Sequence, residues 1–140
     1  GGVYRRWTER FGICRIVADY AHHPTEIRSS VETALFLSKH VVCVFQPHTF
    51  SRTKAFMQQF VDCFRGTTVV YLPIFAAREK PIDGVNSNAL ATLARQCGVD
   101  AYYADSFAEA RSIVLAKVTS ATDTVLVLGA GNVVDFARLL

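Results

Sequence analysis

Two short polar segments of this chain combine carboxylate, phenol, imidazole and guanidinium groups at spacings that could hold a small charged ligand. The first is DYAHHPTE at 19–26, and the second is FQPHTFSR at 45–52. Each begins at the end of a short apolar run, so each is expected to leave the carboxyl end of a strand. In an open α/β sheet, ligands bind in the crevice at those ends. The two segments together therefore define a candidate binding site.

The second segment predicts an anion site. Arg52 and Lys54 fall in the first turn of a helix expected from Ser51, where the helix dipole makes a cation mildly unfavourable. Arg52 follows His48 by four residues. A guanidinium, an imidazole and free helix N–H groups can together hold a carboxylate or a phosphate. From local composition alone, a solvated helix start with His48 as a local cap explains these residues equally well.

The first segment offers both nucleotide and amino-acid contacts. Asp19 at a strand end suits a ribose hydroxyl pair or a cation, and Tyr20 offers a flat face and a hydroxyl. His22 and His23 are adjacent and cannot point the same way. His22 is the better-placed ligand contact, and His23 is expected to be a helix cap or a packed structural residue. A zinc or manganese site of Asp19, His22 and His48 is a less favoured alternative, because adjacent residues are not a known ligand pattern.

A third turn, GAGN at 129–132, resembles the start of a dinucleotide-binding fingerprint. Val134 occupies the place of the third glycine, and no acidic residue follows about twenty positions on. A tight turn with close backbone packing explains Gly129 and Gly131 at least as well. A stand-alone dinucleotide-binding module is therefore kept as an alternative. No GxxxxGK[ST] motif occurs, so chemistry on a nucleoside triphosphate would need another domain.

The elements that position these segments alternate along the chain. Short apolar runs predict strands near 12–18, 40–45, 67–72, 99–103 and 123–128. Helical periodicity predicts helices over 24–38, from Ser51 as N-cap, over 87–96, over 106–118 and after Asn132. Alternating β and α units are typical of a mainly parallel sheet.

This pattern predicts an α/β fold, a three-layer α/β/α Rossmann-like sandwich. The runs at 41–45 and 125–128 are apolar on both faces, as expected of central strands covered on both sides. Residues 1–10 are expected to form an edge segment or the approach to the first strand. The long connection at 74–86 leaves the carboxyl end of a strand, and connections of that length are often functional.

Composition bounds the remaining possibilities. The 140 residues predict one domain, and 51% hydrophobic residues with a net charge of +3 argue against disorder and against a nucleic-acid-binding face. The four cysteines lack CxxC spacing and are expected to be buried thiols of a reducing compartment. Without a visible signal peptide or an apolar run of 18 residues, the expected location is the cytoplasm, with no membrane contact.

Four motifs carry a resemblance to a known family. DYAHHPTE at 19–26, FQPHTFSRT at 45–53, AREKPIDGVNS at 77–87 and LGAGN at 128–132 resemble, in order and spacing, the C-terminal domain of Mur ligases. The opening GVYRRW also resembles the segment that leads into that domain. The likeness therefore covers residues 1–140 as a single domain. The N-terminal UDP-sugar domain and the central ATPase domain of such enzymes are absent from this sequence.

The resemblance implies part of a cytoplasmic ATP-dependent ligase of peptidoglycan synthesis that joins L-alanine to UDP-N-acetylmuramate through an acyl phosphate. The domain alone would be inactive. By motif position, Asp19 would lie near the ATP ribose, Tyr20 and His22 would line the alanine site, and His48 with Arg52 would hold the alanine carboxylate. Mg²⁺ would be bound mainly by the absent central domain, and no general base or other catalytic residue is assigned. A family member that attaches a murein tripeptide is the alternative, and FQPHTFSR favours the L-alanine enzyme.

Overall fold

The computed structural model describes the backbone of residues 2–8 and 12–140 and the side chains of residues 14–140. Its centre is a six-stranded sheet of order β1-β2-β6-β3-β4-β5. The strands are β1 (Gly2–Thr8), β2 (Gly12–Asp19), β3 (Val41–Phe45), β4 (Thr68–Tyr71), β5 (Asp100–Tyr103) and β6 (Thr124–Leu128). All neighbours pair in parallel except β1, which pairs antiparallel with β2 at the edge. The mainly parallel sheet and the edge segment are thus confirmed.

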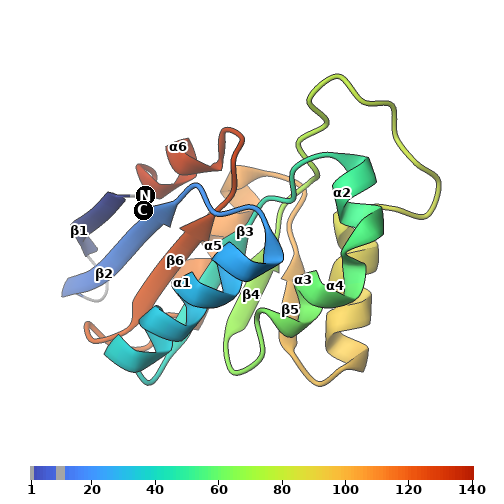
Figure 1. The fold of residues 1–140 in the computed structure, drawn as a ribbon. Helices are drawn as coiled ribbons and strands as arrows, with labels where there is room; N and C mark the ends of the chain where they lie inside the picture. Colours follow the sequence, from blue (N-terminus) through green and yellow to red (C-terminus); the bar gives the residue numbers. More distant parts are fainter. Residues whose placement is uncertain (1, 9–11) are drawn as a thin grey trace.

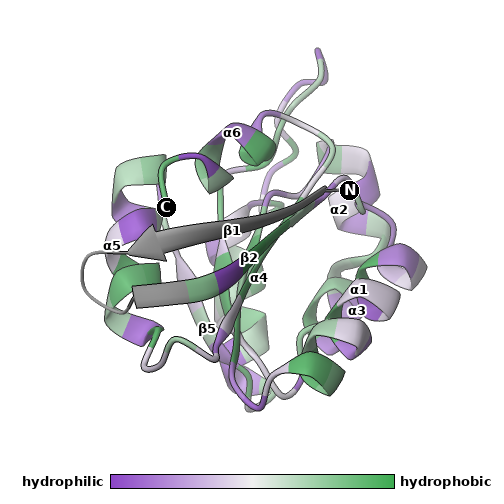
Figure 2. Cartoon of the chain, turned by 90° about the vertical axis from the view of Figure 1, so that its left-hand side faces the viewer, coloured by the Kyte–Doolittle hydropathy of each residue, from purple (hydrophilic) through white to green (hydrophobic). Residues whose placement is uncertain are grey.

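Helices cover both faces of the sheet, which confirms the three-layer sandwich. Figure 2 looks at the β1–β2 edge and shows the helices divided between the two sides. One face carries α1 (Pro24–Leu37), α3 (Met57–Asp62) and α4 (Ser87–Gln96); the other carries α5 (Phe107–Lys117) and α6 (Val133–Ala137). The short α2 (Phe50–Ala55) lies at the carboxyl ends of the strands (Figure 1).

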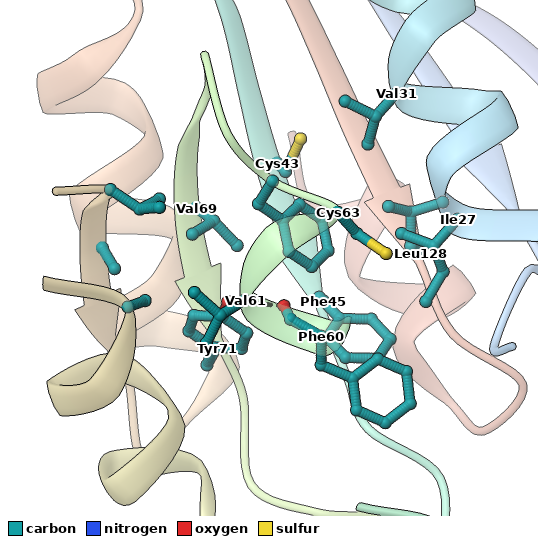
Figure 3. Packing of buried hydrophobic residues seen from close by; sticks show 14 of the residues in the cluster. Ile27, Val31, Cys43, Phe45, Phe60, Val61, Cys63, Val69, Tyr71 and Leu128 are labelled. Atoms are coloured by element: carbon teal, nitrogen blue, oxygen red, sulfur yellow. Dashed lines mark hydrogen bonds between the residues drawn. The ribbon is translucent and has the colours of Figure 1, made fainter. Parts of the chain in front are cut away.

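An aromatic cluster beneath β3 holds the strand end from which residues 46–52 leave. The Phe45 ring lies 5.1 Å from the Phe60 ring and 5.4 Å from the Phe64 ring, measured between centroids. The Tyr71 hydroxyl donates to the carbonyl of Phe60 at 2.8 Å (Figure 3). All four side chains are fully buried. Because close-packed interiors resist small displacements, this cluster gives the second polar segment a rigid base.

The helix predicted from Ser51 differs from the structure in two ways. It begins at Phe50, with Thr49 as N-cap, because the Thr49 hydroxyl accepts the N–H of Arg52 at 3.3 Å. It is also broken at Phe56 (φ −122°, ψ 24°), so that α2 is six residues long and α3 follows. The apolar spacing that predicted one helix continues across the break, and side-chain periodicity does not report a local backbone change.

The long connection between β4 and α4 is also confirmed, and it packs on the second polar segment. The N–H of Phe75 donates to the carbonyl of Pro47 at 2.9 Å, and the N–H of Thr49 donates to the carbonyl of Phe75 at 2.8 Å. Ala77 and Arg78 have φ values of 50° and 75°. Residues other than glycine rarely adopt this region, and such conformations persist only where surrounding contacts hold them. Figure 1 shows this loop reaching out beside α2.

Three of the four cysteines are buried as expected, whereas Cys97 is only partly buried. All four are free thiols, and Cys14, Cys43 and Cys63 are buried. Burial raises the pKa of Cys43 to about 12, so this thiol stays protonated and unreactive.

Within the described part of the chain, no helix has the length and apolar character needed to cross a membrane.

Candidate functional site

The first polar segment forms a tight turn that ends in a capped helix. His23 is the N-cap of α1: its Nδ1 accepts the N–H of Thr25 at 3.4 Å, and Glu26 accepts the N–H of His23 at 3.3 Å. Pro24 takes the first helical position, where its missing N–H costs nothing. The His23 ring also lies against Phe56, 5.3 Å between centroids. The expectation that His23 is a cap or a packed residue is therefore confirmed.

His22 points the other way, toward the second polar segment. Its ring lies 6.0 Å from the ring of His48. Its Nδ1 is 2.9 Å from the carbonyl oxygen of Tyr20, and because a carbonyl only accepts, Nδ1 must carry the proton. A neutral His22 then has a lone pair on Nε2. The Tyr20 side chain is 58% exposed and lies at the outer rim.

Both carboxylate oxygens of Asp19 accept hydrogen bonds from the protein itself. Oδ1 accepts the N–H of Ala21 at 2.9 Å, and Oδ2 accepts the hydroxyl of Ser30 on α1 at 2.6 Å. Asp19 also lines a cavity of about 180 Å³ between β2 and α1, together with Val17, Ser29, Ser30, Thr33 and Leu37. Each oxygen keeps a free lone pair, so a further donor can still be accepted. The first role of Asp19 is nevertheless to hold the 19–23 turn against α1.

The second polar segment brings His48 and Arg52 together as expected, and both carry a polar atom without a partner. Among the described side chains, His48 Nδ1 and Arg52 Nη1 are buried and form no hydrogen bond. Burial lowers the pKa of His48, and the positive charge of the nearby Arg52 guanidinium lowers it further. At neutral pH, His48 is therefore an uncharged imidazole beside a guanidinium. Buried polar atoms without partners are costly, which is typical of a site that awaits a ligand.

The free helix N–H groups expected beside Arg52 are already occupied, so that expectation was wrong. The N–H of Ser51 donates to Glu79, and the N–H of Arg52 donates to Thr49. With only six residues, α2 also places Arg52 in its last turn as much as in its first. The dipole therefore neither opposes Arg52 strongly nor adds to an anion site. Side chains supply the positive charge.

Glu79 belongs to the motif at 77–87, and its side chain contacts the second polar segment. Its two oxygens accept the N–H of Ser51 at 2.9 Å and the hydroxyl of Ser51 at 2.5 Å. These hydrogen bonds hold the pKa of Glu79 below its ordinary value. The long loop is thereby joined to the turn that carries Arg52. The length of the loop, at the carboxyl end of a strand, was the signal that pointed to this region.

The glycine turn after β6 is closed by the protein's own atoms. At Gly129 (φ 150°), a Cβ would lie 2.7 Å from Val133 Cγ1 and 2.9 Å from the carbonyl oxygen of Gln46. At Gly131, it would lie 2.7 Å from Gln46 Oε1 and 2.8 Å from the Phe75 ring. Close packing explains both glycines, and the structure adds no support for a dinucleotide site.

The metal alternative also gains no support from the geometry. Asp19 already accepts hydrogen bonds from Ala21 and Ser30, and His22 Nδ1 donates one to the carbonyl of Tyr20. Among the described residues, no group of three His, Cys, Asp or Glu side chains is placed to hold a metal ion.

The fold and the site define an α/β/α domain whose candidate ligand-binding side chains lie at the carboxyl ends of β2 and β3. Residues 6–131 match the family described as Mur ligase, glutamate ligase domain, and the chain belongs to this family.

Two relatives with similar sequences carry the same activity in their names. The chain is 47% identical to UDP-N-acetylmuramate–L-alanine ligase of Desulfitobacterium hafniense over 89% of its length, and 40% identical to that of Clostridium perfringens over 99%. It spans 28% and 31% of these relatives. Among solved structures, UDP-N-acetylmuramate–alanine ligase of Thermotoga maritima superposes with a TM-score of 0.68 at 22% identity, covering 94% of this chain and 26% of that one. A murein peptide ligase of Psychrobacter arcticus gives 0.65 at 15% identity, covering 92% and 29%. The structural likenesses establish the fold.

Proposed function

We propose that this chain is the C-terminal domain of a cytoplasmic ATP-dependent ligase that joins L-alanine to UDP-N-acetylmuramate in peptidoglycan synthesis. The names of relatives up to 47% identical support this reading. Since the chain spans less than a third of those relatives, the UDP-sugar site and the ATPase would lie in other domains. The domain alone would be inactive.

One observation carries the amino-acid site: the buried, unpartnered His48 Nδ1 and Arg52 Nη1 lie in one turn. A carboxylate would satisfy both, with one oxygen accepting from the guanidinium and the other from the Nδ1–H tautomer of neutral His48. Charge-assisted hydrogen bonds of this kind are about twice as strong as neutral ones. Arg52 and His48 would thus bind and orient the alanine carboxylate.

His22 supports the same orientation from the first segment. Because its Nδ1–H is given to the carbonyl of Tyr20, Nε2 can accept a hydrogen from the amine of the amino acid. The amine would then face the activated muramoyl carboxylate, with Tyr20 at the rim. An acyl phosphate is lost to water unless the amine is positioned and the site is closed before the reaction. The chain would therefore act by positioning, and we assign no general base to it.

ATP would meet this domain at Asp19. Its remaining lone pairs and its place at the end of β2 suit a ribose hydroxyl. ATP supplies the phosphoryl group that activates the carboxylate. The magnesium that accompanies it would be held mainly outside this chain.

Kinetics of the full-length enzyme test the amino-acid site. In Arg52→Ala, we expect the KM for L-alanine to rise roughly 30-fold or more, equivalent to about 2 kcal/mol, with little change in the KM for the UDP-sugar. Lys54→Ala is the matched control, since Lys54 is an exposed cation two residues away on α2. Equal effects of Arg52→Ala on both substrates would overturn the assignment. Competition between L-alanine and a murein tripeptide would distinguish the two members of the family.

A further inference from the structure

We propose that Phe75 determines the side-chain size of the amino acid that this site accepts. The inference rests on the proposed function, because it concerns the substrate held by His48 and Arg52. It begins with the stacking of Phe75 on His48: the ring centroids are 5.6 Å apart and the planes differ by 16°. The rings beside His48 are therefore His22 and Phe75.

This arrangement puts the ring of Phe75 within reach of the substrate's side chain. If Arg52 and His48 take the carboxylate and His22 takes the amine, the α-carbon lies among these side chains, and its own side chain would face the ring that stacks on His48. The backbone of Phe75 is held by hydrogen bonds with Pro47 and Thr49, and its ring stacks on His48, so the ring forms one wall of the proposed site. The methyl group of alanine would fit against this ring, whereas a longer side chain would clash with it.

Beyond the wall lies an open cavity of about 390 Å³, lined in part by Gln46, Phe75, Ser106, Phe107 and Asn132. The side chain of Gln46 is only 7% exposed; its amide donates to Asn132 at 3.0 Å, and its Oε1 is buried without a partner. Phe75, at 37% exposure, and Gln46 Oε1 both lie against the same point beside Gly131. Removal of the Phe75 ring would therefore connect the proposed amino-acid site with this cavity. It would also expose Gln46 Oε1, a hydrogen-bond acceptor without a partner.

The chemical class of the alternative substrate follows from this acceptor. With the ring removed, the enlarged site would take unbranched L-α-amino acids of three or more side-chain carbons. It would favour those that end in a hydrogen-bond donor, such as L-glutamine. Differences of one methylene in an apolar pocket change specificity roughly 10- to 200-fold.

The test compares kcat/KM of the full-length enzyme for L-alanine, L-norvaline and L-glutamine. In Phe75→Ala, we expect the preference for L-alanine over L-norvaline to fall at least about tenfold, whereas Phe75→Tyr, which keeps the ring, should retain it. Adding Gln46→Met to Phe75→Ala should remove the gain for L-glutamine and keep that for L-norvaline. Phe75→Leu, a smaller change, should shift the preference in the same direction if Phe75→Ala does not fold.

The outcomes separate this inference from the function on which it rests. An unchanged preference in Phe75→Ala or Phe75→Leu, while Arg52→Ala still raises the KM for L-alanine, would overturn the role of Phe75 alone. If Arg52→Ala leaves that KM unchanged, the proposed amino-acid site itself is wrong.

Discussion

Both carboxylate oxygens of Glu79 accept hydrogen bonds from Ser51, across 28 residues of sequence. Ser51 precedes Arg52, and Glu79 follows the strained residues Ala77 and Arg78. This pair therefore joins the long loop to the turn that contains Arg52, the residue proposed to bind the substrate's carboxylate. It also places one negative charge near His48 and Arg52, where it opposes the lowering of the His48 pKa.

Loss of the charge on Glu79 should weaken its hydrogen bonds with Ser51. In the full-length enzyme, we expect Glu79→Gln to raise the KM for L-alanine severalfold and to leave the KM for the UDP-sugar unchanged, because one strong acceptor becomes a weaker one. Asp83→Asn, an exposed acid on the same loop, is the control and should have no effect. An unchanged KM for L-alanine in Glu79→Gln would show that the Ser51 contact does not order the site.

The protonation of His48 can be measured directly in this chain. Burial and Arg52 lower its pKa below the ordinary 6.5, so the imidazole should remain neutral until the pH falls below that value. Arg52→Ala removes one of these causes and should raise the pKa of His48. Nitrogen-detected NMR titration of the imidazole measures both. A pKa above 6.5 that does not respond to Arg52→Ala would contradict this account of the site.

The cap of α1 predicts a stability effect without a functional one. His23→Ala should lower the free energy of unfolding by about 0.5–2 kcal/mol, whereas His23→Asn, which still offers a capping acceptor, should lose less. Urea unfolding measures the difference. In the full-length enzyme, His23→Asn should keep the KM for L-alanine; a large rise would mean that His23 contacts substrate.

Asp123 predicts an acid-sensitive contribution to stability. Burial alone would raise its pKa, but hydrogen bonds from the Thr119 N–H and from His40, at 2.8 Å each, outweigh burial and hold it below 3.8. The stabilisation is therefore present above pH 3.8 and is lost as the pH falls through the lowered pKa. Asp123→Ala should cost roughly 2–4 kcal/mol near neutral pH.

Urea unfolding of the parent and of Asp123→Asn tests the sign of this effect. The difference in unfolding free energy between them should be largest near pH 7 and should shrink near pH 3. A difference that grows on acidification would contradict the assigned direction.

Local features of the site could be predicted from neighbouring residues in the sequence. The period of apolar residues placed the strands, His23 was expected as a cap or a packed residue at the start of the helix over 24–38, and the four-residue spacing of His48 and Arg52 placed both side chains on one turn. Such features depend on neighbours within one or two turns of chain, and local spacing determines them.

The distant residues that meet at that turn could not be predicted from local sequence, because they are brought together by the fold. Gln46 reaches Asn132 across 86 residues because β6 lies between β2 and β3 in the sheet, an order that no local pattern reports. Likewise, Phe75 lies on His48 and Glu79 on Ser51 because the loop after β4 packs beside the end of β3. Strand order and loop packing follow from the burial of the whole core, so the contacts of Phe75 with the proposed amino-acid site depend on the folded chain and not on local sequence.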